Sequence, residues 1–277
     1  MDTPISVANP DERTAAPTLA DRLRAARVEL VALALLVGVT AATSLYTASR
    51  MFRYGPLDYL FHIDTAQLMA ERGSIELPHF GYHLYVILLD ALLPGLNDQG
   101  LATVSIVTLR AAAAVVIFLL LRGVVRKPLS YRAGLGLAAV SFALLVVTPI
   151  TIPTWDEGRM YLGYIGMNTF HNPTIIMLVP LALALAWITT RITFSEPGRP
   201  GLARDAALAA VLLTLSTLVK PNYLLALLPA VGLLCLWRLL RGERLPWGAL
   251  IGGLAVPGVI VLAWQYLYTY GGLSSSE

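Results

Sequence analysis

The chain has 277 residues, of which 57% are hydrophobic and 13% charged, whereas a soluble domain carries about 25% charged residues. The chain also contains long apolar runs of about 20 residues, which together with this composition indicate an integral membrane protein. Polar and apolar residues do not alternate within these runs, which favours helices over barrel strands. The net charge of +3 does not point to nucleic acid because the basic residues lie at the ends of these runs, and the single cysteine, Cys235, excludes an internal disulfide or a cysteine metal site.

In chain order, residues 1–27 are polar, and we expect them to form a disordered cytoplasmic tail. Seven membrane spans are predicted at 28–48, 101–121, 133–152, 174–190, 205–219, 222–240 and 247–268. Residues 28–270 would then form one transmembrane module, followed by a short tail at 271–277. The predicted fold class is all-α, a polytopic membrane helix bundle with juxtamembrane helices in its first outer loop.

The apolar stretch 79–95 is too short to span and contains Asp90 and Pro94. With seven spans and a cytoplasmic N-terminus, fourteen of the 20 Lys and Arg residues lie inside and five outside, whereas an eighth span at 79–95 would reverse this bias. The positive-inside rule therefore predicts a juxtamembrane or re-entrant helix at 79–95. The outer loops are then 49–100 and 153–173, and together they hold all four histidines: His62, His79, His83 and His171.

Residues 58–72 predict a helix that ends at Gly73. Asp58 and His62 are four residues apart, which places them on one face with about 6 Å between their Cβ atoms. An acid beside a histidine suits proton abstraction, although the same pattern also fits the solvated face of an interfacial helix. His79 and His83 have a chelating spacing, but Gly81 between them weakens a helix there, and we predict no metal site.

In the second loop, Asn172-Pro173 predicts an N-cap followed by proline at the first helical position. His171 would then lie beside the N-terminus of span 174–190, where free amides favour a phosphate. Plain helix capping accounts for the same residues without a ligand.

Two cations stand out because they oppose the general pattern of charge. Lys220 lies in an outer turn with Pro221, where it could bind an anionic group or extend to the membrane surface. Arg110 lies within a predicted span, and a charge there is either functional, part of a salt bridge, or extended toward the outer headgroups.

The order of these features resembles the N-terminal transmembrane module of GT-C type glycosyltransferases, which include the protein O-mannosyltransferases and the aminoarabinose transferase of lipid A. In those families the first outer loop begins with an acid, and a helix follows that ends in glycine about fifteen positions later, as Asp58 and Gly73 do here. Residues 109–122 resemble the second span of the family, and residues 220–223 resemble its Lys-Pro turn. Many members have a second acid directly after the first, whereas this chain has Tyr59 at that position. Members also commonly have more spans than this chain and often a soluble domain.

The resemblance implies inverting transfer of a sugar from a polyprenyl-phosphate donor to a glycan, lipid or protein acceptor at the extracytoplasmic face. Asp58 would be the base, and His62 would tune it or relay its proton. Three groups would neutralise the leaving phosphate, namely Arg159, His171 and Lys220. Arg110 would lie behind them. Asp156 or Glu157 would position a substrate or hold a divalent cation, and His79 and His83 would lie at the membrane interface or line the substrate groove.

Two other classes of function remain open. A non-catalytic membrane subunit of a glycan or lipid assembly system would work with a second membrane chain, and the short C-terminal tail favours it. A lipid or anion transporter would need polar residues in the spans and an internal repeat. The spans look clean apart from Arg110, which disfavours the transporter.

Overall fold

The computed structural model describes residues 18–53, 58–125, 127–147 and 172–271. Within these ranges every regular element is a helix. Six helical segments are long and apolar enough to cross a membrane: Leu23–Met51 of α1 (Leu19–Met51), α4 (Asp98–Val124), α7 (Pro173–Thr193), α8 (Leu202–Val219), α9 (Asn222–Leu240) and the continuous helix Trp247–Tyr270. The chain is therefore a polytopic α-helical membrane protein, as its composition predicts.

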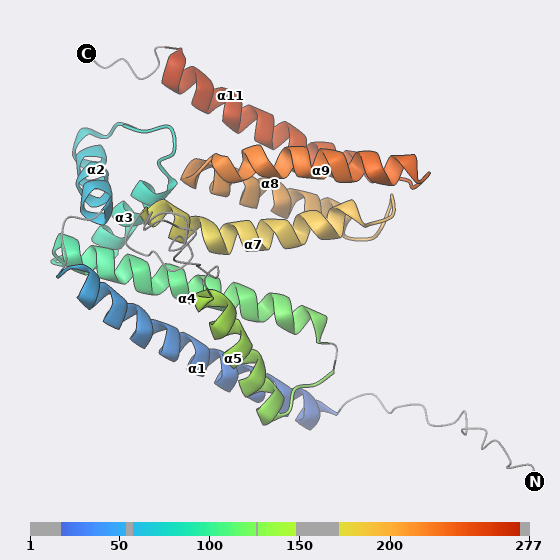
Figure 1. The fold of residues 1–277 in the computed structure, drawn as a ribbon, viewed down its shortest axis with the longest axis horizontal. Helices are drawn as coiled ribbons and strands as arrows, with labels where there is room; N and C mark the ends of the chain where they lie inside the picture. Colours follow the sequence, from blue (N-terminus) through green and yellow to red (C-terminus); the bar gives the residue numbers. More distant parts are fainter. Residues whose placement is uncertain (1–17, 54–57, 126, 148–171, 272–277) are drawn as a thin grey trace, which may run out of the picture.

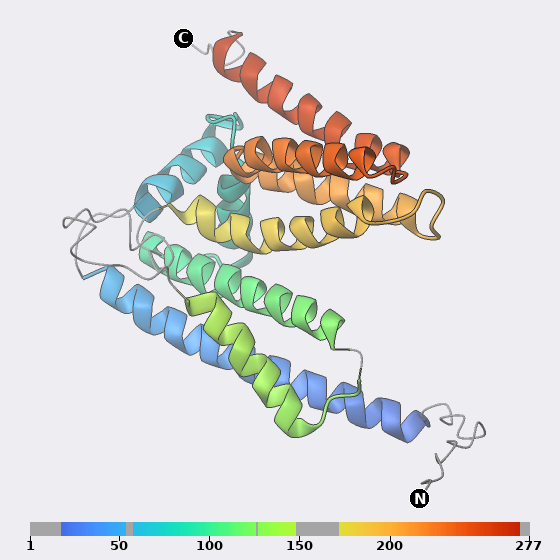
Figure 2. The same cartoon turned by 45° about the vertical axis from the view of Figure 1, so that its right-hand side comes forward.

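The helices form two groups that meet along α4 and α7 (Figures 1 and 2). In the first group, α1, α4 and α5 (Tyr131–Val146) pack against one another. In the second, α8 packs against α7, α9 and the last helix, which consists of α10 (Trp247–Leu250), a π-helical segment (Ile251–Ala255) and α11 (Val256–Tyr270). Many large apolar side chains on the outer faces are exposed, as expected for surfaces in contact with lipid.

Two short helices, α2 (Asp58–Arg72) and α3 (Gly81–Leu92), lie across one end of the bundle, here called the α2–α3 end (Figure 1). With 12 residues, α3 rises only about 18 Å, well short of the ~30 Å apolar core of a bilayer. This length agrees with the prediction that 79–95 does not cross the membrane. The prediction that the helix at 58–72 ends before Gly73 is confirmed, and Gly73 adopts a left-handed φ of 62°.

The path of the chain agrees with seven passes along the bundle. The helix α5 begins at the end where α4 finishes, whereas α7 begins at the α2–α3 end (Figure 1). The chain therefore passes from one end to the other between them. The helical part of the expected span 133–152 ends at Val146, and positions 148–152 of that span lie outside the described residues. The helix α1 begins at Leu19, within the last part of the predicted tail 1–27.

The opposite end of the bundle, here called the basic end, is organised by ion pairs. The buried carboxylate of Asp205 is 2% exposed and accepts hydrogen bonds or salt bridges from Arg199 and from Arg191, the latter at 3.1 Å. Arg122 pairs with Glu29 at 2.7 Å and so joins α4 to α1. Buried charges are stable only when they are paired, so these contacts hold the basic end in one arrangement.

Side-chain packing holds α2 and α3 at their end of the bundle. One buried cluster joins the last turns of α1 to α2, α3 and the first half of α4, and its largest members are Met51, Tyr59, Ile63, Tyr82 and Leu101. The Tyr82 hydroxyl lies 3.0 Å from that of Ser105 on α4, which satisfies both buried groups. These contacts fix the two short helices against the ends of the spans.

A close backbone contact brings α3 to the end of α8. A Cβ atom at Gly81 would lie 2.8 Å from a side-chain carbon of Val219 and 3.1 Å from its backbone nitrogen. Glycine is therefore required there, because any larger residue would push the two helices apart. At the other end of α8, Gly253 allows a similar approach to Ala206, as expected for a packing glycine, whereas Gly252 has open space around it.

Candidate functional site

Asp58 is the first residue of α2, and its side chain reaches the start of α7. Its carboxylate accepts a hydrogen bond of 3.1 Å from the backbone N–H of Asn172. A carboxylate at this position also interacts favourably with the positive end of the α7 dipole. The place beside the α7 N-terminus where a phosphate was expected thus already holds a negative side chain, and this contact couples the start of α2 to the start of α7.

Asn172 and Pro173 precede and open α7 as predicted, but the capping differs. Asn172 is left-handed, with φ 72°, and its side chain makes no capping bond to the backbone. Instead it accepts a hydrogen bond from the hydroxyl of Thr174. A left-handed residue directs its side chain away from the first helical amides, which is why the expected side-chain cap does not form.

The shortest contact between histidines in the site joins α2 to α3. His62 Nδ1 lies 2.9 Å from His83 Nε2, and the two ring centroids are 5.0 Å apart. His83 is fully buried, whereas His62 is half-buried and packs edge-to-face with Tyr82, with 5.7 Å between the two ring centroids. The expectation of His62 beside Asp58 on one helix face stands, and His83, predicted as a groove residue, is instead a buried partner of His62.

Burial and neighbouring charges keep both imidazoles neutral. Burial lowers the pKa of His83 to about 4, with smaller contributions from His62 and His79. Burial also lowers the pKa of His62; Asp58 raises it, while His79 and Lys220 lower it further. The pair therefore carries no charge at neutral pH, even though a carboxylate lies nearby.

Lys220 and His79 complete the group from other elements. Lys220 follows the last residue of α8 in extended conformation, and its ammonium is close enough to Asp58 and His62 to influence them electrostatically. Burial lowers the pKa of Lys220, and Asp58 opposes that shift. Lys220 thus belongs to the electrostatic surroundings of Asp58 and His62, although it is far from them in sequence.

His79 lies before α3 rather than on it. Because the helix begins at Gly81, His79 and His83 are not one helical turn apart, so the chelating spacing considered from the sequence does not form on a helix. Among the residues that the structure describes, no cluster of three or more His, Cys, Asp or Glu side chains is arranged to hold a metal ion. His79 instead borders a groove.

This groove has a volume of about 600 Å³ and runs from His79 and Pro221 along α9 and α11. Its walls are mainly apolar and include Leu225, Val259, Leu262, Tyr266 and Tyr270. At its polar end Gln265, 7% exposed, donates hydrogen bonds to the carbonyls of Pro78 (2.9 Å) and Thr217 (3.0 Å). An apolar channel that begins beside a cluster of charged groups has the shape and polarity to hold an amphiphile.

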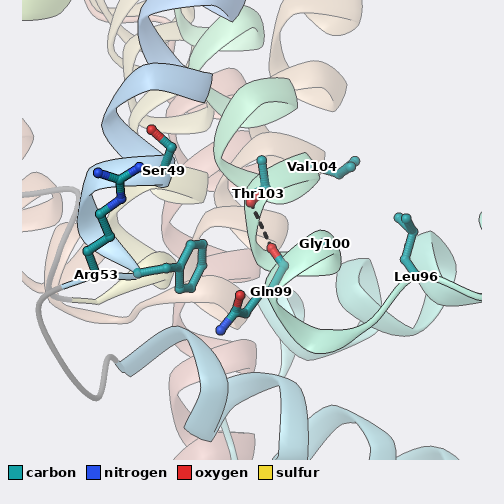
Figure 3. A pocket seen from close by; sticks show the side chains of 8 residues that line it. Ser49, Arg53, Leu96, Gln99, Gly100, Thr103 and Val104 are labelled. Carbon is teal, nitrogen blue, oxygen red and sulfur yellow. Dashed lines mark hydrogen bonds between the residues drawn. The ribbon is translucent and has the colours of Figure 1, made fainter.

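A second pocket of about 500 Å³ lies between the end of α1 and the start of α4 (Figure 3). It is lined by Ser49, Arg53, Gln99 and Thr103 together with apolar groups, and the Thr103 hydroxyl donates 2.7 Å to the Gln99 carbonyl. Within the described residues, neither cavity is lined by a residue predicted for catalysis or phosphate binding, but the first groove is bordered by His79, which influences His62 electrostatically, and by Pro221, the residue after Lys220. We therefore assign the candidate site to the first groove and not to this pocket.

The remaining predicted site residues fall into two sets. Arg110, half-buried on α4, interacts electrostatically with the buried hydroxyl of Tyr59, the residue after Asp58. The expected place of Arg110 behind the phosphate-binding groups stays a prediction. Four positions lie outside the described residues: Asp156, Glu157, Arg159 and His171.

The sequence indicates two groove residues, His79 and Gln265, only weakly. His79 is expected at the membrane interface or in a substrate groove, and in the structure it borders the groove. Gln265 is not among the predicted site residues, because the spans were expected to be free of polar groups apart from Arg110. A lone amide in an apolar run nevertheless indicates a buried hydrogen-bonding role. Buried hydroxyls in the spans do not indicate such a role in the same way as Gln265. Many of them, such as those of Thr193 and Thr217, donate a hydrogen bond to a carbonyl of their own helix.

The fold and the site together define a polytopic α-helical membrane protein with a cluster of titratable side chains at one end of its bundle. No protein-family model matches the chain, and no significant match is found among curated proteins or solved structures. Function therefore has to be argued from the site itself.

Proposed function

We propose that this protein is a membrane glycosyltransferase that moves a sugar from a polyprenyl-phosphate donor to an acceptor at the extracytoplasmic face. The observation that supports it best is the convergence of Asp58, His62 and Lys220 beside an apolar groove. A carboxylate, a neutral imidazole and an ammonium beside a hydrophobic channel match a substrate that has a reactive polar head and a long apolar tail.

In the proposed reaction, the acceptor hydroxyl oxygen attacks the anomeric carbon of the donor sugar. The bond between that carbon and the phosphate oxygen breaks with inversion, and polyprenyl phosphate leaves. Asp58 takes the hydroxyl proton late in this step, because a carboxylate is a weak base until the attacking oxygen has become acidic. Lys220 would neutralise the charge that develops on the leaving phosphate, and Arg159 and His171 remain proposals for the same role.

The groove along α9 and α11 supports a lipid donor. Its apolar walls would hold the first isoprenoid units, and its entrance at His79 and Pro221 adjoins Lys220. Burying apolar surface contributes about 25 cal/mol per Å², so the tail would supply binding energy while the phosphate lies at the charged end. A second membrane subunit remains compatible with this proposal as the source of the acceptor site.

The experiment that tests this function compares Asp58→Asn with Asp64→Asn. Both changes remove one charge from α2, and Asp64 is exposed. Asparagine at position 58 can still accept the bond from the Asn172 N–H, so the fold is preserved. Membranes that contain the full chain are incubated with radiolabelled polyprenyl-phosphate sugars, and transfer to lipid, glycan and protein fractions is counted.

We expect Asp58→Asn to lower the transfer rate by about 100-fold or more, as loss of a general base does, and Asp64→Asn to leave it unchanged. Equal activity of the two variants would overturn the assignment of Asp58 as the base. If the wild-type chain transfers no sugar from any donor tested but still binds the donors, the non-catalytic subunit becomes the better account.

A further inference from the structure

The two nitrogens of His83 have different surroundings. Nε2 lies 2.9 Å from Nδ1 of His62, whereas Nδ1 of His83 is buried and has no hydrogen-bond partner within the described parts of the chain. The whole His83 side chain is inaccessible to solvent. A neutral imidazole carries one hydrogen, on one nitrogen or the other, so this asymmetry decides where the hydrogens of the pair lie.

Two arrangements of the neutral pair are possible. If His62 donates from Nδ1, His83 must accept at Nε2 and carry its own hydrogen on the buried Nδ1, where it meets no acceptor. If His83 donates from Nε2, its Nδ1 is a lone pair without a donor. A buried N–H without an acceptor is rarer and more costly than an acceptor with an unused lone pair, so the second arrangement is favoured.

We propose that His83 is a positioning residue that fixes His62 as the neutral tautomer with its hydrogen on Nε2, so that His62 acts in the site as a hydrogen-bond donor and not as a base. The bond made by one nitrogen of a histidine determines which state the other nitrogen presents. Here the bond from His83 occupies the only free lone pair of His62.

The groups that face this pair come from several elements. Asp58 lies one turn before His62 on α2. Tyr82 is on α3, His79 is in the segment before α3, and Lys220 is in the link between α8 and α9. Of these, Asp58 favours a cationic His62, while burial, His79 and Lys220 oppose it. The depressed pKa values of both imidazoles agree with a pair that stays neutral.

The catalytic consequence rests on the proposed function. An Nε2–H donor would bond an acceptor-only group, either the Asp58 carboxylate or an oxygen of the substrate phosphate. It would orient that group without competing for the proton of the acceptor hydroxyl. His62 is thereby reassigned from the relay expected from the sequence to a fixed donor.

The test is nitrogen NMR on the full chain, labelled with ¹⁵N-histidine and reconstituted in nanodiscs. Protonated and lone-pair imidazole nitrogens differ widely in chemical shift, and the four histidines are assigned by replacing each with glutamine in turn. We expect His62 to carry hydrogen on Nε2 alone between pH about 8 and about 5.5, a range that spans the ordinary histidine pKa. Hydrogen on Nδ1 of His62, or titration near its ordinary pKa, would overturn the proposal.

Two variants separate the hydrogen bond from simple packing. His83→Gln keeps a side-chain N–H donor and should leave the His62 tautomer unchanged. His83→Leu removes the donor and should give a mixture of tautomers with a higher His62 pKa; an unchanged His62 signal in a folded His83→Leu protein would contradict the assignment. If His83→Leu does not fold, the wild-type and His83→Gln spectra still decide. None of these signals depends on sugar transfer, so failure of the proposed reaction would be seen separately.

Discussion

Asp58 has a structural partner as well as a proposed chemical role. Its bond to the Asn172 N–H joins α2 to α7, and its charge influences His62 and Lys220. The sequence indicated Asp58 through its position at the start of an amphipathic helix. It did not indicate the contact with Asn172, because the two residues are 114 positions apart and only the packing of α2 against α7 brings them together.

The buried histidines predict how stability depends on pH. The pKa of His83 is about 4 in the folded protein and about 6.5 when it is unfolded. The unfolded state therefore binds the extra proton first, so this contribution to stability is complete above about pH 6.5 and is lost as the pH falls toward 4. We expect a fall on the order of 2 kcal/mol, measured as unfolding temperature in detergent across this range.

His83→Gln provides the control for this prediction because it removes the titrating group and keeps a donor toward His62. Its unfolding temperature should change less between neutral and acidic pH than that of the wild-type protein. An equal acid sensitivity in both proteins would assign the effect to other groups.

Lys220 gives a second prediction at the residue scale. Lys220→Met removes the ammonium beside Asp58 and His62 while it retains an unbranched apolar chain. If Lys220 neutralises the leaving phosphate, the rate of transfer should fall by about tenfold to 100-fold in the same membrane assay. Lys127→Met, an exposed position between α4 and α5, is the matched control and should retain full activity. Equal losses in both variants would remove Lys220 from the site.

Among the elements, α3 depends most on a single backbone contact. Its start packs so closely on the end of α8 that a Cβ at Gly81 would collide with Val219. The sequence marked Gly81 only as a weak point for a helix. In the structure it is the first residue of α3 and lies against the end of α8.

Gly81→Ala should therefore separate α3 from α8 and destabilise the protein by about 1–3 kcal/mol, the usual cost of overpacking. Gly38→Ala in α1 is the control, since nothing lies within 4 Å of a Cβ there and alanine favours a helix interior by up to about 1 kcal/mol. Thermal unfolding in detergent measures both variants. A Gly81→Ala protein as stable as the wild type would show that α3 can shift without cost.

For the whole molecule, the two ends of the bundle differ in charge and in the kind of contacts they make. The basic end holds buried or partly buried ion pairs, such as Asp205 with Arg191 and Arg238 with Glu243 at 2.6 Å. The α2–α3 end holds neutral histidines, one carboxylate at the α7 N-terminus and an apolar groove. By the positive-inside rule the basic end should face the cytoplasm.

Cysteine labelling tests this orientation. In a Cys235→Ala background, single cysteines are placed at exposed positions of the two ends, as Ser74→Cys after α2 and Glu196→Cys between α7 and α8. A membrane-impermeant maleimide should label Ser74→Cys in intact cells and Glu196→Cys only after permeabilisation. The reverse pattern would place the candidate site on the cytoplasmic side and rule out an extracytoplasmic reaction.

The sequence by itself determined the class of fold and the limits of α2. These follow from local properties, namely the length of the apolar runs and a glycine at a helix end. Tertiary structure alone decided the partners, namely Asp58 with Asn172, His62 with His83, and Lys220 beside both α2 and α3. Such contacts depend on how helices distant in sequence pack and how closely their backbones approach at positions such as Gly81, and no local pattern encodes that distance.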